Sequence, residues 1–198
     1  MMKLLLASGS PRRRELLQQM GLTFTVAPVD LDETPRPGEA PRHYVRRMAL
    51  EKAQAAQARA TEALVLAADT SVILEQQILG KPDNDQQAAA MLQQLSGRSH
   101  QVMTAVALAG PGGFLQDCLV VTEVQFCPLS DDQIHAYLAT GEHRDKAGAY
   151  AIQGRGGIFV QHLSGSYSAV VGLPLQETAG LLAKAGQPAW QDWELTHE

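Results

Sequence analysis

Cysteine is scarce in this chain of 198 residues, which contains only Cys118 and Cys127. The two form no CxxC pair, and one pair is too few for the disulfide framework of a small secreted protein. Their odd separation would place them on opposite faces of an unbroken strand. We therefore expect a protein of a reducing compartment, located in the cytoplasm.

An excess of positive charge is also missing, because the formal net charge at pH 7 is −5. Proteins that coat nucleic acid usually present a dominant basic surface, so nucleic acid is not an expected partner. No apolar stretch reaches the length that spans a membrane, and the apolar run at residues 4–7 is too short for a signal peptide. No membrane association is expected either.

The remaining composition is that of a globular protein. Hydrophobic residues make up 45% of the chain, enough to bury a core in a single domain over residues 1–198. Charge is unevenly distributed, since residues 1–60 hold 10 Lys and Arg but 6 Asp and Glu. Arg14, Arg42 and Arg59 fit the solvated faces of helices, whereas other cations in this region could bind a small anion.

The first part of the sequence predicts a strand, a loop, a helix and a second strand. Ser10 with Pro11 provides an N-cap followed by proline at the first helical position, and Gly21 provides a stop. The expected elements are a strand at 3–7, a helix at 11–20, a strand at 23–26, a loop at 28–41 that borders the site, and a helix at 41–60.

Hairpin and helix signals alternate in the rest of the chain. An apolar run at 64–68 predicts a buried strand with Asp69 at its carboxyl end. The other expected elements are a hairpin of 72–74 with 78–79, a helix from Asp83 or Asn84 to Ser96, a hairpin of 101–109 with 114–126, a helix at 131–139 after a capping box at Ser130, strands at 156–163 and 168–171, and a helix at 174–185. The fold class is therefore α/β with a mixed sheet.

The loop at residues 7–13, Ala-Ser-Gly-Ser-Pro-Arg-Arg, is the first candidate site. A loop of small residues before a helix N-terminus exposes backbone N–H groups to an anion, and two guanidinium groups stand beside it. The pattern suits a polyphosphate, although an ordinary capped helix with exposed arginines has the same signature. The P-loop pattern GxxxxGK[ST] is absent, and the glycines at 154–157 lack the spacing of a dinucleotide fingerprint.

Carboxylates and lysines form the second group of candidates. A carboxylate at a strand end, such as Asp69, could bind metal, act as a base or cap a turn. Lys52, and Lys81 in a rigid Gly-Lys-Pro turn, could hold phosphate oxygens, although most lysines are solvated. The histidines show no HxxxH or HExxH pairing, so any metal should be a hard ion with oxygen ligands.

Several ordered blocks together resemble the Maf family of nucleotide pyrophosphatases over residues 3 to about 182. The blocks are SGSPRRRELL at 8–17, YVRRMA at 44–49 with Lys52 and Ala53, ADT at 68–70, GKP at 80–82, LSG at 95–97 with His100, and DKAGAYAIQG at 145–154. Ala40, Met48 and Ser71 depart from the residues usual in the family, but none of these changes removes a chemical group that the resemblance relies on.

This resemblance implies a two-lobed α/β fold like that of inosine triphosphatases, with a mixed twisted sheet flanked by helices and a cleft between the lobes. It implies hydrolysis of a nucleoside triphosphate between the α and β phosphates, with a small nucleotide as the partner and a homodimer as one option. The implied roles are Asp69 as general base, Arg13, Lys52 and Lys81 as triphosphate ligands, Ser8 as a further donor, and Glu33 with Asp69 as ligands of Mg²⁺ or Mn²⁺.

Three positions distinguish branches of this family. The branch selective for 7-methyl-GTP has Trp, Gln and Glu where this chain has Arg12, Thr70 and Gln153. The residues found here match the branch that hydrolyses dTTP and UTP, so the resemblance implies that they contact a pyrimidine substrate. The alternative is a nucleotide-binding regulator of cell division or septum formation, in which turnover is incidental. Release of pyrophosphate from UTP separates the two.

Overall fold

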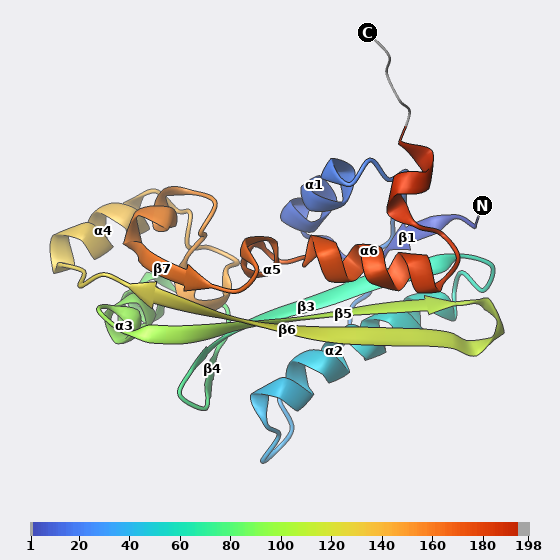
Figure 1. The fold of residues 1–198 in the computed structure, drawn as a ribbon. Helices are drawn as coiled ribbons and strands as arrows, with labels where there is room; N and C mark the ends of the chain where they lie inside the picture. The colour runs from blue at the N-terminus through green and yellow to red at the C-terminus, as the bar shows by residue number, and fades with distance from the viewer. Residues whose placement is uncertain (1, 194–198) are drawn as a thin grey trace, which may run out of the picture. The chain divides into compact units, whose positions relative to one another are not determined.

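The computed structural model describes residues 2–193, in which helices and strands alternate (Figure 1). The strands are β1 (Leu4–Leu6), β2 (Thr25–Val26), β3 (Leu64–Leu74), β4 (Gln77–Leu79), β5 (Ser99–Gly110), β6 (Phe114–Phe126) and β7 (Val160–Ser164). The α-helices are α1 (Pro11–Gln19), α2 (Pro41–Gln57), α3 (Asp85–Leu95), α4 (Asp131–Ala139), α5 (Tyr167–Val171) and α6 (Leu175–Lys184). Short 3₁₀ helices lie at Pro111–Gly113, Ala147–Ala149, Arg155–Phe159 and Ala189–Asp192.

The seven strands of the described chain form one mixed sheet in the order β2-β1-β3-β5-β6-β7, with β4 paired to β3. β1 is parallel to both β2 and β3, whereas β4 is antiparallel to β3 and β7 is antiparallel to β6. The predicted α/β class with a mixed sheet is therefore confirmed. No helix within residues 2–193 is both long enough and apolar enough to cross a membrane.

The chain divides into two compact units, which we describe separately. The first unit comprises Met1–Asp69, Thr104–Leu119 and Gly172–Glu198, and the second comprises Thr70–Met103 and Val120–Val171. Three strands, β3, β5 and β6, contribute residues to both units. The chain therefore passes between the units within strands as well as within loops.

In the first unit, helices cover both faces of the sheet: α2 lies on one face, and α1 and α6 lie on the other (Figure 1). Pro11 begins α1, where its missing N–H leaves no helical hydrogen bond unmade. Leu16 and Leu17 form the buried stripe of α1, and the chain leaves the helix through Gly21 at a φ of 72°. These features confirm the helix predicted at 11–20. Helix α2 also begins as predicted but ends at Gln57, three residues earlier than expected.

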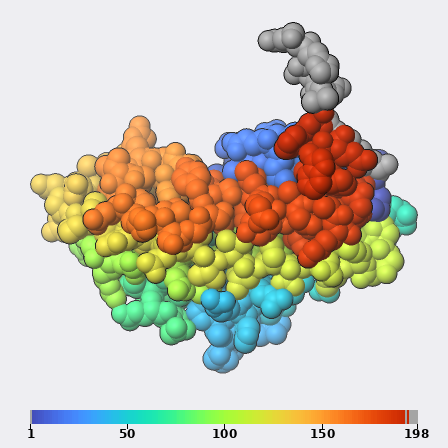
Figure 2. Space-filling view, viewed as in Figure 1, coloured from blue at the N-terminus to red at the C-terminus, as the bar shows by residue number. Residues whose placement is uncertain are grey.

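The C-terminal segment of the described chain packs against the end of α1. The Trp193 indole donates from Nε1 to the carbonyl oxygen of Met20 over 2.7 Å. A Cβ at Gly21 would lie 3.0 Å from the Trp193 ring, so this position needs a glycine for space as well as for its positive φ. Figure 2 shows the two segments side by side, α1 in blue and the C-terminal segment in red. No sequence motif predicted this contact.

In the second unit, α3 and α4 both begin with capping side chains, as predicted. The Asn84 side chain accepts a hydrogen bond from the Gln87 N–H over 2.9 Å. Ser130 and Gln133 form a reciprocal capping box, with bonds of 3.2 and 2.8 Å. These caps satisfy backbone donors that have no partner inside the helix, and so they fix where each helix begins.

A cluster of aromatic rings fills the core of the second unit. His100 is only 2% exposed, and its ring meets those of Phe126 and Tyr150 edge to face. The His100 Nε2 atom and the Tyr150 hydroxyl are 2.9 Å apart. Burial lowers the pKa of His100 to about 4, so the ring is neutral at neutral pH. His100 thus contributes to packing in this unit.

Two strand predictions in the second unit are wrong. The strand expected at 156–163 is shorter, because a 3₁₀ helix occupies Arg155–Phe159 and β7 begins only at Val160. The strand expected at 168–171 is part of helix α5. The Ser166 hydroxyl accepts a hydrogen bond from the Ala169 N–H over 3.2 Å, which caps this turn and favours the helix.

Candidate functional site

Asp69 lies in the interior of β3, so the prediction that it ends a strand is wrong. The strand continues to Leu74, because residues 72–74 pair with β4. Pairing with β1 stops earlier, at Leu66, and the Ala7 N–H donates the last bond to the Leu66 oxygen over 2.8 Å. Asp69 therefore lies just beyond the carboxyl end of its parallel neighbour. The Asp69 carboxylate therefore lies near the carboxyl end of β1 and not at the carboxyl end of its own strand, β3.

The carboxyl end of β1 is a switch point of the sheet. β1 pairs with β2 on one side and with β3 on the other, in parallel in both cases. In open α/β sheets, ligands bind at the carboxyl ends of the strands, at the point where the strand order reverses. The chain that leaves β1 here, residues 7–13, is a loop followed by the first turn of α1, and the sequence identified it as a candidate anion site.

Lys52 joins two carboxylates in this part of the first unit. Its Nζ lies 2.8 Å from Asp69 Oδ1 and 2.6 Å from Glu33 Oε1. The Lys52 and Asp69 side chains are each 10% exposed, whereas the Glu33 side chain is 46% exposed. Burial weakens the competition from water, so the charges of Lys52 and Asp69 act strongly on each other. The structure thus brings together three of the residues predicted to form the site.

The Ser8 hydroxyl and the Arg13 guanidinium organise the loop after β1. Ser8 is buried, and its Oγ accepts hydrogen bonds from the Ser10 N–H and from Arg13 Nη1, each over 3.2 Å. Arg13 Nε donates to the Gly172 carbonyl oxygen over 2.8 Å. Ser10 occupies the N-cap position of α1, but its side chain makes no capping bond. The ordering of this loop therefore comes from Ser8 rather than from Ser10.

The electrostatic surroundings of Arg13 connect this loop with the carboxylates. Burial lowers the pKa of Arg13, and the negative charge of Asp69 opposes that effect. The cation Arg12 lowers the Arg13 pKa further, and Glu33 raises it. Each of these side chains is therefore close enough to influence Arg13. The first unit gathers cations and carboxylates around one edge of the sheet, an arrangement suited to binding an anion together with a metal ion.

Tyr44 and Arg47 of α2 hold the loop that carries Glu33, and the sequence did not identify them as site residues. The Tyr44 hydroxyl donates to the Glu33 carbonyl oxygen over 2.8 Å. Arg47 donates from Nε and Nη2 to the two carboxylate oxygens of Glu39 over 2.6 and 2.7 Å. Arg47 also lies 3.2 Å from Glu51, its neighbour four residues along the helix. Two sequence signals were available for this network: the i, i+4 spacing of Arg47 and Glu51, and the YVRRMA block that contains Tyr44 and Arg47.

The charges around this loop shift two pKa values. The hydrogen bonds from Arg47 lower the pKa of Glu39 to about 2. Desolvation raises the pKa of Tyr44 to about 12, and the negative charges of Asp69 and Glu33 add to that effect. At neutral pH, Glu39 is therefore an anion that binds Arg47, and Tyr44 is a neutral hydroxyl able to donate to the loop.

The first unit offers two carboxylates for a metal ion. Within residues 2–193, no group of three or more His, Cys, Asp and Glu side chains is arranged to hold a metal. Glu33 and Asp69 nevertheless converge on the single ammonium of Lys52. Mg²⁺ is commonly held by one or two carboxylates together with substrate phosphates, and carboxylate oxygens are its preferred protein ligands. The donor set therefore fits a hard divalent ion that shares its coordination with a phosphorylated substrate.

The other predicted site residues lie in the second unit, except Arg12. Arg12 is half-buried at the start of α1, next to Arg13. Thr70 follows Asp69 in β3, and successive residues of a strand point to opposite faces. Lys81 is exposed just after β4, and Gln153 is exposed on the turn that precedes the Arg155–Phe159 helix. Substrate contacts by these residues remain predictions.

Comparison with known proteins assigns this α/β protein to a family. Residues 3–185 match the family described as Maf-like protein. A dTTP/UTP pyrophosphatase from Alcanivorax borkumensis is 57% identical over 192 residues, which cover 96% of this chain and 99% of that protein. A dTTP/UTP pyrophosphatase from Pseudoalteromonas atlantica is 56% identical over 185 residues, which cover 91% of this chain and 96% of that protein. The chain belongs to the Maf family.

A solved structure supports the assignment of the fold. A HAM1 protein from Coxiella burnetii matches 93% of this chain and 100% of its own length, with a TM-score of 0.53 and 17% sequence identity. At this identity the likeness concerns the fold alone. The family and the fold predicted from the sequence blocks are therefore both confirmed.

Proposed function

We propose that this protein hydrolyses dTTP and UTP to the nucleoside monophosphate and pyrophosphate. The observation that carries the proposal is the buried Lys52–Asp69 pair, with Glu33 on the same ammonium, beside the loop that Ser8 and Arg13 organise. The high identity to relatives named dTTP/UTP pyrophosphatases supports the substrate class. We infer a small nucleotide as the partner and a cytoplasmic location.

Asp69 is the proposed general base. Its carboxylate accepts a proton from a water molecule, and the water oxygen then bonds to the α-phosphorus of the nucleotide. The bond from the α-phosphorus to the oxygen that bridges to the β-phosphate breaks, and pyrophosphate leaves with the electron pair of that bond. Lys52 holds Asp69 through the 2.8 Å ion pair, so the base has a fixed orientation before substrate binds.

Arg13, Lys52 and Lys81 are the proposed ligands of the triphosphate, and Ser8 adds a hydrogen-bond donor. A guanidinium can bond to two phosphate oxygens at once, and its attraction strengthens as negative charge develops on the leaving pyrophosphate. The pKa of Arg13 is lowered by burial. A half-buried cation such as Arg13 has less hydration to lose on meeting phosphate than a fully exposed one, so less of the binding free energy is lost to desolvation.

Glu33 and Asp69 are the proposed ligands of Mg²⁺ or Mn²⁺. When bound, such an ion would offset the negative charge that develops on the phosphate groups. Glu33 is accessible enough to reach a ligand, since its side chain is 46% exposed, while Tyr44 fixes its backbone through the 2.8 Å bond. This combination keeps the loop in place and leaves the carboxylate partly exposed, beside the Lys52 ammonium.

Gln153, Arg12 and Thr70 are the proposed determinants of base selection. An amide offers one donor and one acceptor, whereas a carboxylate can only accept. Uracil and thymine present an O4 acceptor beside an N3–H donor, so one amide can bind both groups. Guanine presents two adjacent donors, which suit a carboxylate instead. The amide of Gln153 therefore favours a pyrimidine substrate.

A panel of nucleoside triphosphates tests the proposed function. Pyrophosphate release is measured with dTTP, UTP, CTP, GTP and 7-methyl-GTP, first with Mg²⁺, then with Mn²⁺, and then with excess chelator. We expect dTTP and UTP to be the best substrates and the chelator to abolish release. Absence of turnover of any triphosphate would favour a binding role, and full activity in excess chelator would remove the metal from the mechanism.

A further inference from the structure

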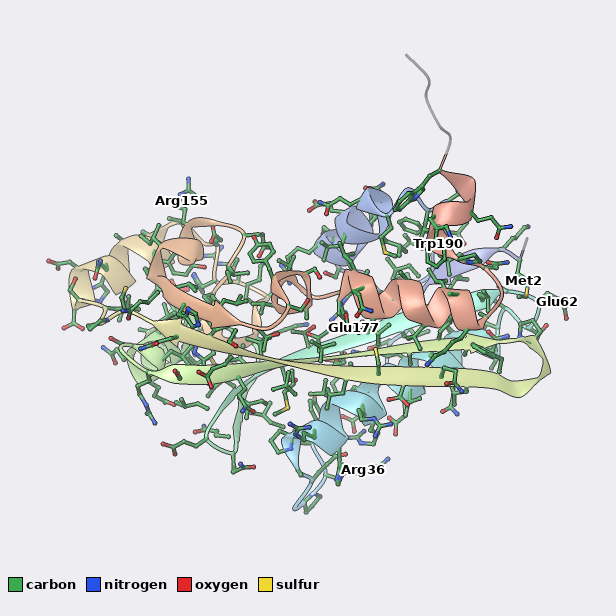
Figure 3. All side chains as sticks on the ribbon, viewed as in Figure 1. Met2, Arg36, Glu62, Arg155, Glu177 and Trp190 are labelled. Atoms are coloured by element: carbon green, nitrogen blue, oxygen red, sulfur yellow. The ribbon has the colours of Figure 1, made fainter. Side chains whose placement is uncertain are left out.

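The Glu142 carboxylate accepts hydrogen bonds from two backbone N–H groups. Its Oε2 accepts a hydrogen bond from the Arg155 N–H over 3.0 Å, and its Oε1 accepts one from the Gly156 N–H over 3.1 Å. The Arg155 side chain, labelled in Figure 3, is 73% exposed, and its Nη1 lies 4.0 Å from Glu142 Oε2, which is longer than the two backbone bonds. Glu142 therefore binds the chain just after Gln153, and it does so through two backbone donors.

Tyr137 extends the same arrangement to the chain before Gln153. Its hydroxyl accepts a hydrogen bond from the Ala151 N–H over 3.1 Å and donates to Glu142 Oε1 over 3.2 Å. The Gly154 N–H closes the turn on the Ala151 carbonyl oxygen over 3.2 Å. The backbone is thus held two residues before Gln153 and two residues after it. The Gln153 side chain, which is exposed, makes none of these bonds.

The turn has no room for a side chain at two of its glycines. A Cβ on Gly154 would overlap the Glu142 carboxylate, and a Cβ on Gly156 would lie 2.8 Å from the Ala151 carbonyl oxygen. Contacts this short do not occur for real side chains, so the glycines allow the carboxylate to pack directly against the backbone. Gly154, at the end of the block DKAGAYAIQG, and Gly156 after it therefore pack closely, Gly154 against the Glu142 carboxylate and Gly156 against the Ala151 carbonyl oxygen.

The charge of Glu142 strengthens this contact. Burial alone would raise the pKa of Glu142, but the two backbone N–H donors and the Tyr137 hydroxyl outweigh it, and the pKa is lowered. The group is therefore ionised at neutral pH. Hydrogen bonds to an ionised acceptor are stronger than those between neutral groups, so the turn is held more firmly than an amide side chain could hold it.

We propose that Glu142 is a positioning residue for base recognition, which fixes the turn that presents the Gln153 amide to the pyrimidine. The proposal rests on the proposed role of Gln153 and adds the means by which its orientation is set. An amide distinguishes uracil from cytosine only when its donor and acceptor are aligned, because cytosine has an amino group where uracil has O4. A loosened turn loses that alignment.

The test compares Glu142→Gln with Glu123→Gln, a matched change on an exposed residue of β6 in the same unit. The values of kcat and KM are measured for UTP and CTP, which share the same sugar and triphosphate. We expect Glu142→Gln to raise the KM for UTP about tenfold, to change kcat by less than about twofold, and to lower the UTP-over-CTP ratio of kcat/KM about tenfold. Glu123→Gln should leave all of these unchanged.

A merely structural role would lower hydrolysis of both nucleotides alike and leave the ratio intact, and that outcome would overturn the proposal. Tyr137→Phe gives an independent test if Glu142→Gln does not fold. It removes a donor to Glu142 and an acceptor for Ala151, and it should lower the same ratio. An unchanged ratio in Tyr137→Phe would also contradict the proposal.

A double variant separates this proposal from the assignment of Gln153. In a Gln153→Ala background, Glu142→Gln should have no further effect on the UTP-over-CTP ratio, because the group that it positions is absent. If Gln153→Ala alone leaves the ratio unchanged, Gln153 does not read the base, and both ideas fail. If Gln153→Ala changes the ratio but Glu142→Gln does not, the positioning role alone is wrong.

Discussion

Lys52 and Asp69 form a buried ion pair in which Nζ donates to Oδ1 over 2.8 Å. Each side chain is 10% exposed, so the loss of either charge would leave the other largely without water to solvate it. Glu33 shares the same ammonium. An amide in place of Asp69 would retain a hydrogen-bond acceptor for Lys52 and keep Glu33 as its counter-charge, which makes a clean test of catalysis possible.

Asp69→Asn should lower turnover of UTP by about 10² to 10⁴, the range expected when a general base is removed. The fold should be retained because the shapes of the two side chains are nearly the same. The measurements are kcat for UTP and the thermal unfolding midpoint. Asp117→Asn, which removes an acidic partner of Arg46 elsewhere in the first unit, is the control and should leave kcat unchanged. Near-normal turnover in Asp69→Asn would exclude Asp69 as the base.

Arg13→Ala should raise the KM for UTP and lower kcat together, because its guanidinium is proposed to bind the triphosphate and to act more strongly as charge develops. The variant also frees the Ser8 hydroxyl and the Gly172 oxygen from their partner. Arg14→Ala is the control, since Arg14 is exposed on the same helix. Steady-state kinetics with UTP decide the matter, and equal constants in wild type and Arg13→Ala would refute the anion loop.

Gln153→Glu should lower kcat/KM for UTP and dTTP. The expected loss of transition-state stabilisation is about 1 to 3 kcal/mol, the scale for leaving a buried polar group unpaired. A carboxylate cannot donate to the pyrimidine O4. Adding Arg12→Trp and Thr70→Gln should begin to admit 7-methyl-GTP, because an aromatic face attracts the cationic base. The measurement is the ratio of kcat/KM for UTP over 7-methyl-GTP in the three proteins, and a constant ratio would show that Gln153 does not read the base.

Glu39 should give the first unit a stability that is lost in acid. Its pKa is lowered from 4.5 to about 2 by Arg47, so the unfolded chain binds a proton more readily than the folded chain in that interval. The contribution is present above about pH 4.5 and is lost as the pH falls through about 2. We expect urea titrations to show that the difference in unfolding free energy between wild type and Glu39→Gln shrinks as the pH falls from about 4.5 to about 2. Glu62→Gln, at an exposed loop position labelled in Figure 3, serves as the control.

His100 should destabilise the second unit as the solution becomes acidic. Burial lowers its pKa from 6.5 to about 4, so the unfolded state takes up a proton first as the pH falls. Stability should decrease between about pH 6.5 and 4, by at most about 1.4 kcal/mol per pH unit from this residue, and the decrease should level off below about 4. His100→Gln should flatten the pH dependence over this interval, whereas the exposed control His135→Gln should retain it. A wild-type slope in His100→Gln would contradict the assignment.

Local signals in the sequence predicted most elements of the fold. The caps at Asn84 and Ser130 placed the starts of α3 and α4, because a capping side chain bonds to backbone only a few residues away. The position of Asp69 within β3 was not predicted, because the runs at 64–68 and 72–74 predict separate strands, whereas the structure joins them in one strand, Leu64–Leu74. The strand expected at 168–171 failed for a related reason: a short apolar run is compatible with strand or helix, and the Ser166 cap decides between them.

The candidate site could be predicted only in part. Ser8, Arg13, Lys52 and Asp69 stand in blocks that resemble a family, and the structure places them in one unit. Arg47 also stands in such a block but was given no role, and Glu142 was not singled out, because the role of each depends on which groups it meets after folding. A charged residue that supports a loop has the same sequence signature as one that is merely solvated. Only its partners distinguish the two.

The contact between Trp193 and Met20 makes the end of α1 visible to spectroscopy. The chain has two tryptophans, Trp190 and Trp193, and both belong to the C-terminal segment of the first unit. Tryptophan fluorescence therefore reports on this segment and on the end of α1. It carries no direct signal from the second unit. Release of the Trp193 indole from the Met20 carbonyl would alter the emission while far-ultraviolet circular dichroism stayed almost constant. Melting curves recorded by the two methods on this protein should accordingly be compared before a single transition is assumed.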